Sequence, residues 1–112
     1  MVEVNLARAR IEDGKTDQLR SWFKELQERE SEVIETLQHE RVYTETAFIL
    51  PSDDTAYLYV YMEAEDLEEA DEAGDKEEYE IDEEHHEVLR DSLTGDWETL
   101  ETIGHFTNHS LR

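Results

Sequence analysis

Two adjacent histidines, His85 and His86, are the first candidates for chemistry, because they stand in the acidic run Glu83–Glu87. On a helix, Asp82 and His86 would lie one turn apart on the same face, so that a carboxylate and an imidazole could share a metal ion. A transition-metal site, however, usually takes three protein ligands in fixed geometry, and no HExxH spacing is present. We therefore predict no metal site and no cofactor.

A second group of candidates joins tyrosines with an asparagine, a glutamate and a histidine on strand-like segments: Asn5, Tyr43, Glu45, Tyr59, Tyr61 and His105. Aromatic walls with a few polar groups are typical of ligand pockets in β-barrels. A carboxyl group such as that of Glu45, beside tyrosines in a dry cavity, would have a raised pKa and could move protons. The alternative is that these side chains fill an interface between subunits. Which face of the second strand would line the pocket also remains open, because the alternate residues Val42, Thr44, Thr46 and Phe48 suit that role equally well.

The elements that would position these residues follow from hydrophobic periodicity. Strands are expected over residues 2–11, 42–50, 56–62 and 100–108, and helices over residues 15–40, 66–74 and 82–93. Asp66, with Glu69 three residues later, and Asp82 are the expected N-caps. The order β-α-β-β-α-β predicts an α+β, ferredoxin-like fold with a four-stranded antiparallel sheet and helices on one face.

The third expected strand indicates a homodimer. Leu58, Val60 and Met62 suit the face that packs under the helices, which leaves Tyr57, Tyr59 and Tyr61 on the opposite face. Three tyrosines form a large patch to leave in water, and the same face of a second copy would cover it through a two-fold interface. The alternative is an exposed sheet with solvated hydroxyl groups.

Several local motifs carry a family resemblance. Gly14-Lys15 leads into a long helix with Trp22 and the run Glu28-Arg29-Glu30, and Glu45 and Phe48 follow. In these motifs and in element order the chain resembles the dimeric α+β barrel superfamily, which includes the antibiotic-biosynthesis monooxygenases, and within it a small uncharacterised branch. The resemblance implies that two sheets pair into a barrel with the candidate residues inside. It implies no particular reaction, because members range from oxygenases to proteins without known activity.

The heme-degrading members of that superfamily use an asparagine on the first strand, a tryptophan, and a histidine on the second helical region. Asn5 and His85 or His86 fall in comparable elements, but Trp22 and Trp97 do not. Heme degradation is therefore not implied for this chain.

Acidity dominates the composition: 32 Asp and Glu residues stand against 10 Lys and Arg residues among 112, for a formal charge of −22. In its scattered acidic residues and scarce lysine the chain resembles proteins of salt-in halophiles. The concentrated salt inside such cells screens the repulsion between acidic residues. No basic stripe could neutralise nucleic-acid phosphates or anionic lipids. Without cysteine, thiolate chemistry is excluded, and no apolar run approaches the roughly 20 residues of a membrane span. A single domain over residues 1–112, located in the cytoplasm, is expected.

Two functions remain open at this point. The first is a halophilic homodimer whose barrel is packed or binds a small aromatic or apolar ligand. The alternative is a cofactor-independent enzyme, monooxygenase-like or isomerase-like, that acts inside the barrel. Pocket volume separates the two, because an enzyme needs room for its substrate.

Overall fold

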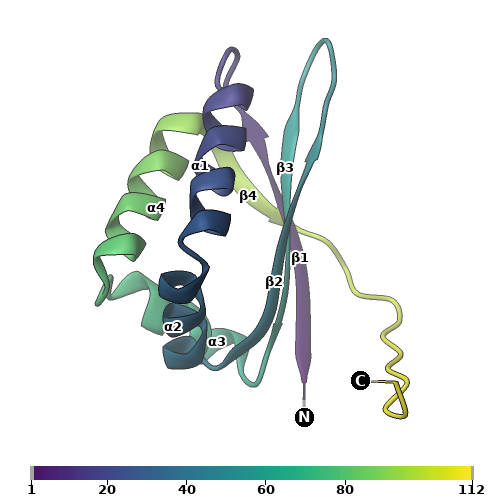
Figure 1. The fold of residues 1–112 in the computed structure, drawn as a ribbon. Coiled ribbons are helices and arrows are strands. Elements are labelled where there is room, and N and C mark those ends of the chain that lie inside the picture. The colour runs from purple at the N-terminus through teal and green to yellow at the C-terminus, as the bar shows by residue number, and fades with distance from the viewer. Residues whose placement is uncertain (1, 112) are drawn as a thin grey trace.

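Helices and strands follow one another in the order β-α-α-β-β-α-α-β in the computed structural model, which describes residues 2–111 (Figure 1). The strands are β1 (Glu3–Ile11), β2 (Val42–Leu50), β3 (Tyr57–Ala64) and β4 (Leu93–Thr99). The helices are α1 (Thr16–Glu28), α2 (Glu30–Glu40), α3 (Leu67–Asp75) and α4 (Glu80–Ser92).

The strands form one antiparallel sheet in the order β2-β3-β1-β4, and the helices cover one face of it (Figure 1). This confirms the predicted ferredoxin-like α+β fold. We call the face under the helices the inner face and the opposite one the outer face. On β3 the side chains alternate as predicted, since Leu58 is fully buried among inner-face residues while Tyr57 and Tyr59 lie on the outer face.

Two apolar clusters attach the helices to the inner face. One joins Leu37 of α2 to Val42, Ala64 and Ala70, and the other joins Leu19 of α1 to Ile11 and Leu58. Burial of a leucine of this kind stabilises the fold by about 1.5–3 kcal/mol. The clusters anchor the helices at both ends of the sheet, and the pocket described below borders on both.

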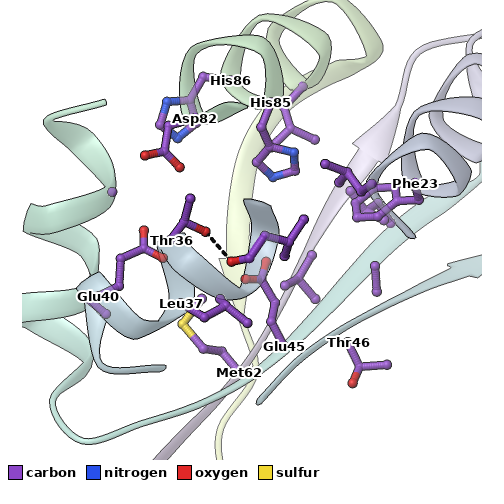
Figure 2. A pocket seen from close by; sticks show the side chains of 18 of the residues that line it. Phe23, Thr36, Leu37, Glu40, Glu45, Thr46, Met62, Asp82, His85 and His86 are labelled. Atoms are coloured by element: carbon purple, nitrogen blue, oxygen red, sulfur yellow. Dashed lines mark hydrogen bonds between the residues drawn. The ribbon is translucent and has the colours of Figure 1, made fainter. Parts of the chain in front are cut away.

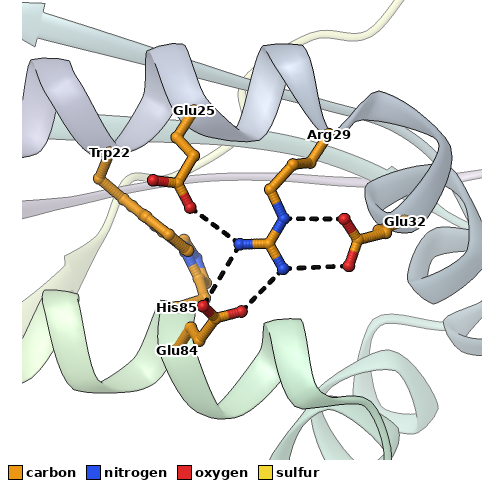
Figure 3. Close-up of polar contacts among 6 residues, drawn as sticks. All are labelled: Trp22, Glu25, Arg29, Glu32, Glu84 and His85. Carbon is orange, nitrogen blue, oxygen red and sulfur yellow. Dashed lines mark hydrogen bonds and ion pairs between the residues drawn. The ribbon is translucent and has the colours of Figure 1, made fainter.

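The single helix expected over residues 15–40 is instead broken at Arg29, whose φ of −104° and ψ of 35° are not helical. The guanidinium of Arg29 donates hydrogen bonds of 2.8 Å to each of three carboxylates, those of Glu25 on α1, Glu32 on α2 and Glu84 on α4 (Figure 3). Arg29, which interrupts the apolar stripe between Leu26 and Val33, thus forms a junction. One cation joins three helices whose acids would otherwise repel one another.

The expected N-caps had different outcomes. Asp66 caps α3 as predicted, because its carboxylate accepts a hydrogen bond from the backbone N–H of Glu69 at 3.0 Å. The prediction for Asp82 was wrong: α4 begins at Glu80 with Tyr79 at its N-cap, which places Asp82 inside the first turn. The side chain of Asp82 lines the space between α4 and the sheet, and it also has a hydrogen bond to the backbone of Tyr79.

The last strand also differs from the prediction. β4 follows α4 without a loop, and the segment 100–108 is not a strand. Gly95, with φ of 77°, lies where the register between β1 and β4 shifts, so this glycine serves an irregular strand pairing and does not end a helix. Apolar residues recur in both segments, which is why their pattern alone did not locate the strand.

Beyond β4 the chain leaves the sheet as an extended tail, residues 100–111, on the outer-face side (Figure 1). Its first residue is still attached, because the N–H of Leu100 donates to the carbonyl of Leu6 at 2.8 Å. Farther on, the side chains of Ile103, Phe106 and Leu111 are 93%, 95% and 86% exposed.

Part of the outer face is aromatic or aliphatic and exposed, although Glu63 on the same face is buried. Phe48 and Leu50 of β2 are 55% and 53% exposed. Beside them, the guanidinium of Arg8 stacks 4.3 Å from the ring centre of Tyr57 and donates to the hydroxyl of Tyr59 at 3.3 Å. A single chain thus leaves a mixed aromatic and aliphatic surface in water.

Candidate functional site

A pocket of about 1040 Å³, partly open to solvent, lies between the inner face of the sheet and the helices (Figure 2). Its floor comes from β1, β2, β3 and β4, and its walls come from α1, α2, α3 and α4. Phe23, Leu37 and Met62 represent its apolar lining, while carboxyl groups and two imidazoles supply the polar part. Ligand pockets typically enclose roughly 300–1,000 Å³, so this space is large enough for a small molecule.

One row of residues across the sheet places polar groups on the pocket floor. Asn5 on β1 and Glu45 on β2 both pair with Met62 on β3, and paired residues of antiparallel strands face the same way. Glu45 faces inward because the register of β2 shifts between Val42 and Thr44. The extra residue reverses the alternation, so that Val42 and Glu45 share the inner face although they are three positions apart, an odd spacing that would place them on opposite faces of a regular strand.

Carboxyl groups converge on this pocket from separate elements: Glu40 from α2, Glu45 from β2, Asp71 from α3 and Asp82 from α4. Partial removal from water, and then repulsion by the other three, raises the pKa of Glu40 to about 7. Desolvation, and then the charge of Asp82, also raises the pKa of Glu45. Water still reaches the side chain of Glu45 from the open pocket, but protein surrounds it closely, and that crowding weakens its hydration.

A glycine makes room for one of these groups. A Cβ atom on Gly74 of α3 would lie 2.9 Å from Oε2 of Glu40, which is closer than such atoms normally approach. The Glu40 carboxyl therefore occupies space that the Cβ atom of any other residue at position 74 would need. Within residues 2–111, the carboxyl groups of Glu40 and Glu45 make no hydrogen bond to another residue, so both carboxyl groups remain available to a ligand.

The two histidines of α4 have different environments. Nδ1 of His85 accepts a hydrogen bond of 2.9 Å from the indole N–H of Trp22, and the ring also packs against Phe23. Desolvation, and then the nearby His86, lowers the pKa of His85 to about 4. His86 instead lies with its Nδ1 3.1 Å from a carboxylate oxygen of Glu77. At neutral pH the pocket therefore contains an uncharged His85 opposite a group of carboxyls.

A family of unknown function, DUF6176, matches the chain over residues 2–110. The chain belongs to this family. No curated protein sequence matches it. This DUF6176 member is thus related by sequence to proteins whose activity is also unknown.

Solved structures extend the comparison to fold. An L-rhamnose mutarotase from Formosa agariphila has a TM-score of 0.62 at 14% identity, over 94% of this chain and 99% of the other. A dimeric ferredoxin-like protein from an uncultured marine organism also has a TM-score of 0.62, at 11% identity over 96% and 100%. A provisionally named antibiotic biosynthesis monooxygenase from Nitrosomonas europaea has a TM-score of 0.56 at 12% identity, over 88% and 86%. These likenesses confirm the predicted resemblance at the level of fold.

The residues predicted as one site lie in separate places in the DUF6176 member. Asn5 and Glu45 line the pocket, but Tyr59 and Tyr61 belong to the outer face, because neighbouring residues of β3 point to opposite sides of the sheet. Tyr43 is the 57% exposed extra residue at the register shift of β2. His105 lies in the tail, with Nε2 3.4 Å from the hydroxyl of Thr107.

Sequence reasoning also missed several groups that line the pocket, notably Glu40 and Asp71. A signal for Glu40 was present, since it continues the apolar stripe of Val33 and Leu37 at helical spacing. Asp71 lies one residue after the buried Ala70 and carries no comparable signal. The bond between Trp22 and His85 joins residues 63 positions apart, and no local pattern indicates it.

Among residues 2–111, no group of three or more histidine, aspartate or glutamate side chains has the arrangement needed to hold a metal ion. No helix in the same range is both long and apolar enough to cross a membrane.

Replacing Glu40 with glutamine is expected to stabilise the protein at pH 8 and to have little effect near pH 5. The raised pKa of Glu40 means that its contribution to stability is present below its ordinary value of 4.5 and is lost as the pH rises through about 7. An uncharged amide avoids that loss, which is on the order of 1 kcal/mol for a partly solvated group. Thermal melts at constant KCl concentration measure the difference. Glu35→Gln, on the exposed side of the same helix, should give the same shift at both pH values. A gain for Glu40→Gln that does not depend on pH would contradict the assignment.

Proposed function

We propose that this DUF6176 protein binds a small, uncharged organic molecule in the pocket between the sheet and the helices. The observation that carries the proposal is the group of carboxyls in an apolar-walled space, which would repel an anionic ligand. The unpaired oxygens of Glu40 and Glu45 can accept hydrogen bonds from hydroxyl groups. Phe23 and Met62 supply apolar contact. The volume supports a ligand-binding protein over a packed one.

A second candidate is an isomerase acting on a cyclic hemiacetal such as an aldose. It is favoured because the carboxyl cluster can contain a protonated and an ionised group at the same time. Ring opening needs a base that takes the proton of the C1 hydroxyl and an acid that protonates the ring oxygen as the C1–O bond breaks. The product is a neutral aldehyde, so no anion forms among the carboxylates. Near pH 7, Glu40 is protonated in part of the molecules, so the cluster can supply both forms.

The same charge argues against an oxygenase that lacks a cofactor. Such a reaction draws electrons from a carbanion or enolate of the substrate, and neighbouring carboxylates raise the energy of that anion. The mutarotase with the similar fold is named for L-rhamnose, which makes this neutral sugar the first compound to test. We therefore favour the isomerase-like alternative over the monooxygenase-like one.

Adding the protein to L-rhamnose is expected to accelerate exchange between the two anomers, measured by saturation transfer between their C1 protons. Glu45→Gln should reduce the acceleration by roughly 10²–10⁴-fold, as expected for loss of a general acid or base. Glu28→Gln, on an exposed position of α1, is the matched control and should leave the rate unchanged. Sugar binding without acceleration would identify a binding protein. If no neutral aldose shifts the amide signals of Asn5, Glu45 and Met62, the proposed ligand class is wrong.

We also propose that the protein is a homodimer in which the outer faces of two copies pack together. The exposed side chains of Phe48 and Leu50, with the tyrosines of β3, support this arrangement. The tail supports it too, since its apolar residues have almost no contact with their own chain. A similar solved structure is described as dimeric.

A halophilic, cytoplasmic setting is part of the proposal. Support comes from the formal charge of −22, which a compact chain tolerates best when concentrated salt screens it. The acidic side chains of α3 are exposed, and the helix contains no lysine or arginine to pair with them. The same charge disfavours nucleic acid and anionic membranes as partners, because it repels their phosphate groups.

A further inference from the structure

The imidazole of His85 is held by one specific hydrogen bond. The indole N–H of Trp22 can only donate, and it points at Nδ1 of His85 over 2.9 Å. Nδ1 must therefore accept and cannot carry a proton. In a neutral imidazole the proton then sits on the other nitrogen, Nε2.

Nearby charges would favour the cationic ring if this bond were absent. The titratable and charged groups that line the pocket with His85 come from five elements: Asp82 and His86 on α4, Arg20 on α1, Glu30 and Glu40 on α2, Glu45 on β2, and Asp71 and Asp75 on α3. Their carboxylates would attract an imidazolium. An imidazolium, however, carries a proton on both nitrogens, so its Nδ1–H would oppose the N–H of Trp22. Two donors set against each other in a largely buried site are strongly disfavoured.

The second nitrogen of the ring is directed into the pocket (Figure 2). Within residues 2–111, Nε2 of His85 has no hydrogen-bond partner. Every fully buried side-chain nitrogen in that range has such a partner, so Nε2 cannot be fully buried. Nε2 is therefore accessible from the pocket and unused by the protein. It faces a space that also contains the carboxyl groups, whose oxygens can accept hydrogen bonds from a ligand.

We propose that Trp22 fixes His85 in its Nε2–H form, so that His85 donates a hydrogen bond from α4 to an oxygen of the bound molecule. The role in ligand binding rests on the proposed function, because it needs a molecule in the pocket. It specifies that molecule further: the ligand presents an accepting oxygen, such as a ring oxygen or a carbonyl, toward α4. Its hydroxyl groups would be oriented toward the carboxyls on α2 and β2.

The protonation of His85 can be measured without any ligand, by long-range ¹H–¹⁵N NMR of protein labelled at histidine nitrogen. We expect Nδ1 of His85 to be unprotonated and Nε2 protonated, with no titration as the pH falls from about 8 to about 5, because its pKa is about 4. In Trp22→Phe, a population with Nδ1–H should appear and the ring should titrate at higher pH. A proton on Nδ1 in the wild type, or a tautomer unchanged in Trp22→Phe, would overturn the role assigned to Trp22.

The ligand role is tested with L-rhamnose as the probe. Binding is expected to shift the Nε2 signal of His85 and to weaken roughly tenfold in His85→Leu, while His109→Leu in the tail has no effect. Binding that neither moves Nε2 nor depends on His85 would overturn the donor role and leave the proposed function intact. If the wild type binds no aldose, the proposed function fails instead, and the ligand-free spectra still decide whether Trp22 fixes the tautomer.

Discussion

Transfer of the protein from about 3 M KCl to about 0.05 M KCl is expected to unfold it or to separate its subunits. The 32 acidic residues outnumber the 10 basic ones, and the resulting charge of −22 is spread over a 13.3 kDa chain. The Debye length rises from about 3 Å at 1 M salt to more than 10 Å below 0.1 M, so that repulsion between neighbouring carboxylates is restored. Circular dichroism and sedimentation velocity over the salt series measure the loss of structure and of assembly.

Two comparisons separate screening from other effects of salt. Sucrose strengthens burial through its exclusion from protein surfaces but screens no charge, so it should restore little structure in dilute KCl. The double variant Glu68→Gln/Glu72→Gln removes a like-charged pair one turn apart on exposed positions of α3. It should lower the KCl concentration at the midpoint of unfolding. Ellipticity and sedimentation that stay constant across the series would rule out the halophilic interpretation.

Replacing Phe48 with glutamate is expected to convert the proposed dimer into a folded monomer, even at about 3 M KCl. Phe48 is 55% exposed in the single chain, so a charge there costs the monomer little. In a dimer formed by the outer faces, the new carboxylate would be buried without a partner, which costs several kcal/mol, and two-fold symmetry applies that cost twice. Sedimentation velocity reports the change in mass, and circular dichroism verifies that the monomer is folded.

The choice of Phe48 over Tyr59 follows from the structure. Arg8 donates to the hydroxyl of Tyr59 and could pair with a glutamate at that position, which would weaken the test. Lys24→Glu, at an exposed position of α1, changes the net charge by a larger amount and should remain dimeric. A Phe48→Glu protein that stays dimeric would show that the subunits meet elsewhere, and a monomeric wild type would contradict the homodimer altogether.

Much of the fold could be predicted because its signals are local. Alternation along β1 and β3, the helical spacing from Leu19 to Leu37, and the pairing of Asp66 with Glu69 each depend on residues within one or two turns of the chain. The errors arose where a local pattern had two solutions. The helix break at Arg29 looked like an interruption of one stripe, and the apolar residues after Ser92 fitted either of two strands.

The candidate site was harder to predict, because its members come together only through tertiary structure. Asn5 and Glu45 were both identified, but they were assigned to a barrel interior with Tyr59 and Tyr61. Strand alternation already implied that Asn5 and the tyrosines could face opposite sides once β1 and β3 were paired. The register of that pairing, with Asn5 opposite Met62, depends on residues far apart in sequence.

The sequence by itself determined the order of the elements, the apolar character of both faces of β3 and the excess of negative charge, since each depends on residue types and their local spacing. Tertiary structure alone decided where the pocket lies and which groups share it. The shifted register of β2 turned Glu45 inward, where burial and then the charge of Asp82 on α4 raise its pKa. The packing of α2 placed Glu40 where burial, and then Asp82 and Glu45, raise the pKa of Glu40. Electrostatic coupling and hydrogen bonding act over a few ångströms, whatever the separation along the chain. They therefore appear only when the helices are placed on the sheet.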